Sequence, residues 1–257
     1  MPAAPAPQAV YGCSRAAIRE DGVSKRIPVS MPLFSPLDLF AVGFFALTWS
    51  TYAVLMEWTQ HGGRGLNAHM HRYRDGWMQQ MLRREMRMVD AQIMAALQNG
   101  TAFFASTSLI AIGGTLTVLR STEDLITIVS TLPFGIPTTR MEWEIKAIGL
   151  AMIFVYAFFK FAWAYRLYNY VAIMIGAMPP ASERDSPEAK RHAVRTGKLC
   201  ESAGRHFNRG QRAFFFALGY LGWFISPWLL FFSSIAIFFV MWGRQFHSDA
   251  RTAVTAD

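Results

Sequence analysis

Apolar residues gather into four long segments of the chain, and polar, mostly basic stretches separate these segments. An α-helix needs roughly 20 apolar residues to cross the hydrocarbon core of a bilayer, and each segment reaches that length. No stretch alternates apolar and polar residues as the strands of an outer-membrane barrel do. The pattern predicts an all-α integral membrane protein with four transmembrane helices, at about residues 37–57, 91–119, 147–167 and 213–242.

The four predicted spans make up one transmembrane domain over residues 37–243. Residues 1–36 contain Pro, Ala and scattered charge without an apolar run of signal-peptide length, so we expect a retained and mostly disordered N-terminal tail. Residues 244–257 are expected to form a short C-terminal tail.

Two of the polar stretches carry helical patterns of their own. Between Tyr73 and Asp90, apolar residues recur at helical spacing with arginines between them, so this segment either lies in the membrane interface or extends the second span. Ser186 followed by Pro187 is a favourable helix start, and one apolar face continues from it to the fourth span. We therefore expect helical cytoplasmic extensions of spans two and four, which can pair below the membrane.

Composition supports the membrane assignment and excludes several classes of protein. Hydrophobic residues make up 53% of the chain and charged residues only 16%, whereas ordinary globular domains have roughly 25% charged residues. These values exclude a disordered chain, a disulfide-rich secreted module and a typical cytosolic enzyme. The two cysteines, Cys13 and Cys200, lie far apart and have neither redox nor metal spacing.

The distribution of basic residues predicts the orientation in the membrane. The stretch 58–90 holds six Lys or Arg and the stretch 166–212 holds nine, whereas the loop 120–146 holds three. Because cytoplasmic loops carry the excess of positive charge, the first two stretches are expected in the cytoplasm, with the third and both termini outside it. Within the outer loop, residues 125–132 are expected to lie against the membrane surface, before a turn at 133–137.

Lys160 is the clearest ionisable residue inside a predicted span, and it stands in the aromatic run 158–161. An ionisable side chain at membrane depth is costly and is a functional-site hypothesis by default. Two interpretations stay open: the lysine snorkels to the interface, or its ammonium group faces inward. Arg166 and Asn169 lie further along the same span, at its cytoplasmic end.

The second span carries a row of small and polar residues. Asn99, Ser106 and Gly113 are seven residues apart and share one helix face, with Thr107 next to it. This face either packs against another helix, since small and hydroxyl residues permit close approach, or lines a hydrated path. Gln98 and Asn99 are expected near the level of Lys160.

Three further residues mark the ends and the middle of spans. Arg87 and Asp90 are charges at the cytoplasmic end of the second span, where they can bias ion selectivity or pair. Pro227 lies near the middle of the fourth predicted span, so we expect a kink there. With one such proline and no internal repeat, a transporter built from inverted repeats is disfavoured.

Motifs of cofactor, nucleotide or acyl-transfer chemistry are missing from the sequence, so we expect neither an enzyme nor a cofactor. His61, His69 and His71 fall in a segment, 61–76, that is expected to be a loop. No further ligand accompanies these histidines, so we expect no metal site. Anionic lipid headgroups explain the basic stretches better than nucleic acid does.

Two segments resemble a known family. Asn99–Ser108 (NGTAFFASTS) and Phe158–Tyr170 (FFKFAWAYRLYNY) are similar to a bacterial family of four-span membrane proteins with plant relatives, known as a domain of unknown function. The similarity covers about residues 35–245 and implies the four-helix fold and a bacterial inner membrane location. It supplies no activity, but it draws attention to Asn99, Ser106, Thr107, Lys160, Arg166 and Asn169.

Two functions remain in competition. The first is a homo-oligomeric channel or small-solute conductor that leans towards anions, because Lys160, Arg87 and Arg166 favour them and Asn99, Ser106 and Thr107 can replace part of their hydration. The second is an accessory or scaffold subunit of a membrane complex, which docks a partner or anionic lipid through its basic cytoplasmic helices.

Overall fold

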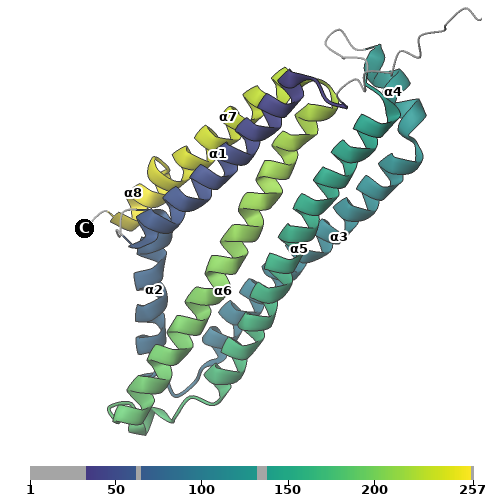
Figure 1. Cartoon of the computed structure of the whole chain (residues 1–257). Coiled ribbons are helices and arrows are strands. Elements are labelled where there is room, and N and C mark those ends of the chain that lie inside the picture. Colours follow the sequence, from purple (N-terminus) through teal and green to yellow (C-terminus); the bar gives the residue numbers. More distant parts are fainter. Residues whose placement is uncertain (1–32, 62–64, 132–137, 256–257) are drawn as a thin grey trace, which may run out of the picture. The chain divides into compact units, whose positions relative to one another are not determined.

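The computed structural model describes residues 33–61, 65–131 and 138–255, and these residues are almost entirely helical (Figure 1). The helices are α1 (Pro36–His61), α2 (Leu66–Met81), α3 (Met88–Arg120), α4 (Thr122–Ser130), α5 (Arg140–Gly176), η1 (Ala181–Glu183), α6 (Pro187–Tyr220), η2 (Leu221–Phe224), α7 (Pro227–Phe246) and α8 (Asp249–Thr255). Four segments are long and apolar enough to cross a membrane: Pro36–Trp58, Met88–Arg120, Arg140–Gly176 and Pro227–Val254. The predicted all-α fold with four apolar spans is confirmed.

Local capping explains where the long helices begin. Thr139 and Glu142 form a capping box at the start of α5, in which the Glu142 carboxylate accepts from the Thr139 backbone N–H at 2.7 Å. At the start of α6, the Ser186 hydroxyl accepts from the Ala189 backbone N–H at 3.1 Å, with Pro187 at the first helical position. The helix start predicted at Ser186 is therefore present in the structure.

Helices α1 and α7 run parallel to each other. Near the start of both helices, the rings of Phe44 and Phe231 are 4.3 Å apart between centroids. Near their ends, the Tyr52 hydroxyl donates to the Met241 carbonyl at 3.3 Å. The beginning of α1 and the end of α7 therefore lie at opposite ends of the apolar layer that these helices form (Figure 1).

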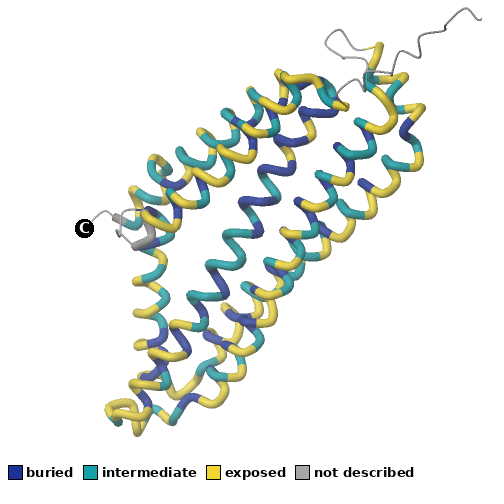
Figure 2. The backbone as a smooth tube through the Cα atoms, viewed as in Figure 1, coloured by how far each residue is buried: buried dark blue, intermediate teal, exposed yellow. Residues whose placement is uncertain are grey.

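Helix α6 runs antiparallel to its neighbours α1 and α5 and lies between them (Figure 1). Residues late in α1 or α5 contact residues early in α6 and the reverse, as the ring pairs Phe45–Tyr220, Phe154–Phe214 and Phe161–Phe207 show. Buried positions recur along the length of α6 (Figure 2). Its C-terminal half thus passes through the same layer as the four apolar helices, as a fifth helical crossing of that layer.

The single fourth span predicted over residues 213–242 is corrected by this arrangement. The segment is a helical hairpin, in which α6 leads into η2 and the chain turns back into α7. Pro227 does not kink a helix; it occupies the first position of α7, and Ser226 caps that helix by accepting from the Leu229 N–H at 3.1 Å. The turn packs tightly at Gly222, where an added Cβ would meet the backbone of Leu229 at 3.1 Å.

The side chains form two hydrophobic cores along the bundle. The core of the apolar layer joins α1, α5, α6 and η2, and its large members include Phe45, Tyr52, Trp143, Phe154, Phe161, Phe216, Tyr220 and Trp223. The second core joins α2, the start of α3, the end of α5 and the start of α6, and includes Met78, Met81, Met94, Leu167, Tyr168, Val171, Ala193 and Cys200. We call the part built on this second core the basic half, because it contains the arginine-rich stretches.

The helical extensions expected for spans two and four are present, but they are connected to the spans differently from the prediction. Residues 66–76, predicted as a loop, belong to α2, because Met78 and Met81 of the same helix bury completely against α6. Helix α2 is separated from α3 by the connection 82–87, so it does not continue span two as one helix. The extension assigned to span four is the N-terminal half of α6. The apolar residues 125–130 lie in α4, whereas the predicted turn at 133–137 and the tail 1–32 lie outside the described residues.

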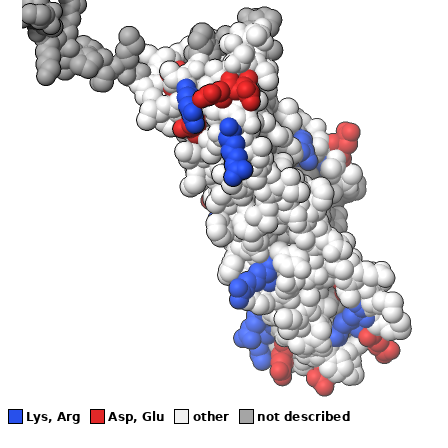
Figure 3. All heavy atoms as spheres, turned by 90° about the vertical axis from the view of Figure 1, so that its right-hand side faces the viewer, with Lys and Arg blue, Asp and Glu red and all other residues white. Residues whose placement is uncertain are grey.

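Charged side chains on the face formed by α3 and α5 gather towards its two ends, with a broad uncharged band between them (Figure 3). At one end, Arg140 pairs with Glu123 at 3.0 Å and with Glu144 at 2.8 Å. At the other end, Arg84 pairs with Asp90 at 2.8 Å. This distribution is typical of a helical protein that crosses a bilayer.

Candidate functional site

The row of small and polar residues predicted on the second span faces outward. Asn99, Ser106 and Gly113 are exposed on the side of α3 that is turned away from the rest of the subunit. Asn99 and Ser106 make no hydrogen bond to the residues described. Thr107 is half-buried and donates to the Phe103 carbonyl at 2.8 Å. This row therefore lines no path within one subunit.

A second row with the same spacing forms the buried face of α3 and continues into the first residue of α4. Thr101, Ser108, Thr115 and Thr122 are seven residues apart and at most 4% exposed. Each hydroxyl donates to the carbonyl four residues earlier, at 2.7 to 3.3 Å. These residues satisfy their own polar groups and permit close packing against α5, so they need no ligand.

The polar residues predicted on the third span have different surroundings. The Lys160 ammonium is half-buried and lies 5.1 Å from the centroid of the Tyr156 ring, and no described carboxylate pairs with it. Arg166 is exposed and donates to the Tyr170 hydroxyl at 2.7 Å. Asn169 accepts from the Gln98 amide at 2.7 Å. Asn169 therefore makes its interhelical hydrogen bond with Gln98, the neighbour of Asn99.

Arg87 and Asp90 fasten the basic half together. Arg87 donates to the carbonyls of Met178 and Pro179 and so ties the start of α3 to the connection that follows α5. The Asp90 carboxylate is fully buried and accepts from the Trp77 indole N–H at 2.6 Å as well as from Arg84. These charges therefore hold elements together, and neither faces a cavity that the structure describes.

A buried polar cluster at the other end of the bundle joins α1, α5 and η2. Lys146 is 4% exposed; its ammonium donates to the Trp223 carbonyl at 3.1 Å and lies 3.9 Å from the Asp38 carboxylate. That carboxylate also accepts from the Trp223 indole N–H at 2.7 Å. From the sequence, Lys146 was counted only among the charges of the loop 120–146. The acid Asp38, at the very start of an apolar segment, was the available sign that a buried basic partner was needed.

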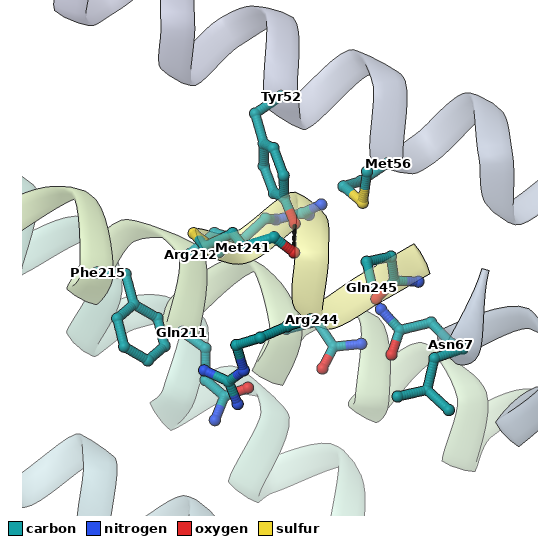
Figure 4. Close-up of a pocket in the computed structure, with 11 residues that line it drawn as sticks. Tyr52, Met56, Asn67, Gln211, Arg212, Phe215, Met241, Arg244 and Gln245 are labelled. Atoms are coloured by element: carbon teal, nitrogen blue, oxygen red, sulfur yellow. Dashed lines mark hydrogen bonds between the residues drawn. The ribbon is translucent and has the colours of Figure 1, made fainter. Parts of the chain in front are cut away.

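The site with the clearest binding chemistry is a cavity of about 160 Å³ where α1, α2, α6 and α7 meet (Figure 4). It lies where α1 and α7 end and α2 begins, at the boundary between the apolar layer and the basic half. We call it the arginine pocket; its lining residues are Tyr52, Met56, Leu66, Asn67, Asn208, Gln211, Arg212, Phe215, Met241, Arg244 and Gln245.

Two guanidinium groups give the arginine pocket its positive charge. Arg212 is only 8% exposed and makes no hydrogen bond or ion pair with the residues that the structure describes. Arg244 lies over the Phe215 ring, 5.4 Å from its centroid. None of the lining residues is acidic. Glu57 lies outside the lining and pairs with Arg209 at 2.7 Å, so the lining itself carries a surplus of positive charge.

The N-terminus of α2 adds to the positive potential of the pocket. Helix α2 begins after Gly65 without a side-chain cap, and its first turn contains no acidic residue. The Gln245 amide lies beside this turn, where its oxygen can accept from the backbone N–H groups of Leu66 and Asn67 at 3.3 and 3.2 Å. Because a helix N-terminus carries a partial positive charge, an anion is favoured at this position.

Sequence reasoning missed the arginine pocket because it placed Arg212 in a cytoplasmic loop. The available signal was that Arg212 directly precedes the apolar run Ala213–Tyr220, so that helical continuation carries it into the bundle. Arg244 and Gln245 were assigned to a C-terminal tail, whereas they belong to the last turns of α7.

Metal and thiol chemistry find no support among the described residues. No three His, Cys, Asp or Glu side chains group there in a way that could hold a metal ion. His69 bonds to the Gly65 carbonyl at 3.1 Å and His71 pairs with Glu201, whereas the side chain of His61 lies outside the described residues. Burial raises the pKa of the Cys200 thiol, which therefore stays protonated at neutral pH.

The fold and its band of apolar helices define an integral, multi-pass membrane protein of the all-α class. The sequence matches the family described as "Protein of unknown function, DUF599" over residues 40–250, and the chain belongs to this family. The matched region runs from α1 into α8 and includes the whole arginine pocket. No curated protein and no solved structure matches the chain.

Proposed function

We propose that the protein is a homo-oligomeric conductor of small anions and that the arginine pocket is its anion-binding site. The observation that carries the proposal is Arg212, which is only 8% exposed and makes no hydrogen bond or ion pair with the described residues. A buried and unpaired charge is strongly unfavourable, whereas a bound anion supplies the missing partner. With Arg244 beside it and no acid in the lining, the pocket favours anions over cations.

The interior of one subunit supports an oligomeric conductor rather than a pore through the monomer. Next to the pocket, towards the start of α1, the rings of Trp49 and Phe216 stack with centroids 5.7 Å apart, and Phe45 packs against Phe216. This aromatic cluster fills the interior of one subunit, so the proposed path runs between subunits. The exposed Asn99 and Ser106 suit a contact with a second copy, because polar side chains hydrogen-bond across membrane helices.

We propose that the basic half faces the cytoplasm of a bacterial cell, with the start of α1 outside. The five crossings by α1, α3, α5, the C-terminal half of α6 and α7 then lead to a C-terminal end inside the cytoplasm. This replaces the expectation that both termini lie outside, which followed from an even number of crossings.

Anion flux into proteoliposomes tests the proposed function. Vesicles that contain the purified protein and an anion-sensitive dye should take up nitrate faster than empty vesicles do. Arg212→Gln should lower the protein-dependent flux at least about tenfold, since a hydrogen bond to a charged group contributes about 1.5–3 kcal/mol. Arg195→Gln is the matched control, because Arg195 is an exposed arginine of the same helix and lies outside the pocket.

Two results would contradict the proposal: no protein-dependent flux for the unaltered chain, or equal flux for Arg212→Gln and Arg195→Gln. Lys160→Leu separates the two interpretations of Lys160. If its ammonium group lies along the path, this variant changes the flux or the preference among anions, whereas a snorkelling lysine leaves both unchanged.

One observation favours the alternative function as an accessory subunit that docks a partner or anionic lipid. At the far end of the basic half, Arg83, Arg184 and Lys190 surround an open hollow of about 360 Å³. Asp185 is the acid in that lining, and it pairs with Arg184 at 3.6 Å and Lys190 at 3.7 Å. An accessory subunit of this kind shows no flux in the same vesicles, so the flux experiment separates the two functions.

A further inference from the structure

We infer that the arginine pocket is a phosphate-binding site, which takes either free phosphate or the phosphate of a phospholipid headgroup. The inference rests on the proposed anion site and assigns its ligand class. Three properties of the pocket carry it: the geometry of its donors, its charge and its size.

The donors of the pocket suit a ligand with several oxygen atoms. Arg212 and Arg244 each present a planar fork of N–H groups, which matches the oxygen atoms of a phosphate in a bidentate manner. Amide groups of Asn67, Asn208 and Gln211 stand in the same lining and can donate further hydrogen bonds. A spherical anion such as chloride uses few of these directional donors, whereas a tetrahedral phosphate can use donors from several sides.

Charge points to the same class of ligand. Two guanidinium groups line the cavity, the N-terminus of α2 with Gln245 beside it borders it, and none of its lining residues is acidic. A phosphate with one or two negative charges balances this surplus, and helix N-termini combined with arginine side chains recur in phosphate sites. Glu57, in the last turns of α1, pairs with Arg209 at 2.7 Å and is not part of the lining.

The size and position of the pocket limit which part of a ligand can enter it. A cavity of about 160 Å³ lies below the roughly 300–1,000 Å³ of sites that enclose drug-sized ligands, so it accommodates a phosphate group and little more. Met56, Phe215 and Met241 supply apolar lining at the boundary with the apolar layer. A phospholipid can therefore place its phosphate in the pocket while its acyl chains stay along the apolar helices.

Binding measurements on the full-length protein test the inference. In detergent, calorimetric titration with inorganic phosphate should give binding that Arg212→Gln weakens at least tenfold and Arg195→Gln leaves unchanged. In nanodiscs that contain phosphatidylglycerol, native mass spectrometry should find a retained phospholipid if the headgroup is the source, and Arg212→Gln should remove it. Arg212→Lys keeps the positive charge but lacks the planar fork of N–H groups, so we expect phosphate affinity between those of the unaltered protein and Arg212→Gln.

The outcomes separate the two sources and the two proposals. Phosphate titration without a retained lipid assigns free phosphate, and a retained lipid that inorganic phosphate does not displace assigns the headgroup. If neither phosphate binding nor a retained phospholipid is found, the inference is overturned, even where nitrate flux depends on Arg212. Arg212-dependent phosphate binding without any flux supports the site and overturns the proposed conduction. If Arg212→Gln elutes as an aggregate, Arg244→Gln serves as the second variant and should weaken phosphate binding in the same way.

Discussion

Replacement of Asp90 by alanine should strongly destabilise the basic half, although Asp90 lies only three residues after the largely exposed connection 82–87. The carboxylate is fully buried and accepts from the Trp77 indole at 2.6 Å and from Arg84 at 2.8 Å. Its removal leaves the indole N–H without a partner, at about 1–3 kcal/mol. The Arg84 side chain is 43% exposed and can be hydrated once the carboxylate is gone, so the loss of its ion pair adds less to the destabilisation. We expect a total of about 3 kcal/mol, well above the about 1 kcal/mol of a typical point mutation.

Thermal unfolding in detergent, followed by circular dichroism or intrinsic tryptophan fluorescence, measures this effect. For a domain of this size, about 3 kcal/mol corresponds to a Tm lowered by about 6–12 °C. Glu85→Ala is the control: Glu85 is an exposed acid of the same connection, and its removal should change stability by at most about 0.5 kcal/mol. Asp90→Asn should fall between the two, because its amide oxygen still accepts from Trp77. Equal Tm values for Asp90→Ala and Glu85→Ala would refute the reasoning.

Two further predictions concern the apolar layer. Gly149→Ala should lower the Tm, because the added Cβ meets the Tyr220 hydroxyl on α6. Tyr220→Phe should restore much of this loss in the Gly149→Ala background and should change the Tm of the unaltered chain little. If Gly149→Ala lowers the Tm equally with and without the Tyr220 hydroxyl, this contact is contradicted. A fluorescent reporter fused after residue 257 should fold and fluoresce in the cytoplasm, because the proposed topology has five crossings between the start of α1 and the end of α7. A fusion active only outside the cytoplasm would contradict the fifth crossing or the proposed orientation.

The sequence was sufficient for the class of fold, since long apolar runs leave few alternatives for a chain that must satisfy its backbone in lipid. The number of apolar segments, the places of the first three and the helix start at Ser186 were predicted correctly, whereas the fourth segment lies at Pro227–Val254 and not at 213–242. Hydropathy could not predict the crossing by α6, because its C-terminal half follows directly on the polar residues 205–212 without a boundary. The 30-residue segment 213–242 would form a helix about 45 Å long, and that excess over the roughly 30 Å hydrocarbon core was the available sign of a hairpin.

The candidate site was harder to predict than the fold. A heptad spacing identifies residues that share a helix face, but it does not say which face is buried. Asn99 and Ser106 therefore looked equivalent to Thr101 and Ser108, although only the second pair faces α5. The arginine pocket combines residues from four helices, such as Asn67, Arg212 and Gln245, whose proximity depends on the parallel course of α1 and α7. Local pattern contains no information about that proximity.

The hairpin formed by α6 and α7 has a consequence for how the protein enters the membrane. Unlike the four apolar segments, α6 is long enough to span a membrane but not apolar enough to do so on its own. An arginine such as Arg212 opposes insertion by about 2.5–3.5 kcal/mol when it lies at the centre of a segment. Helix α7 follows after a short turn and is strongly apolar. We therefore expect α6 to stay at the membrane surface during synthesis until α7 emerges, so that the two helices insert together and a chain truncated before residue 227 leaves α6 outside the bilayer.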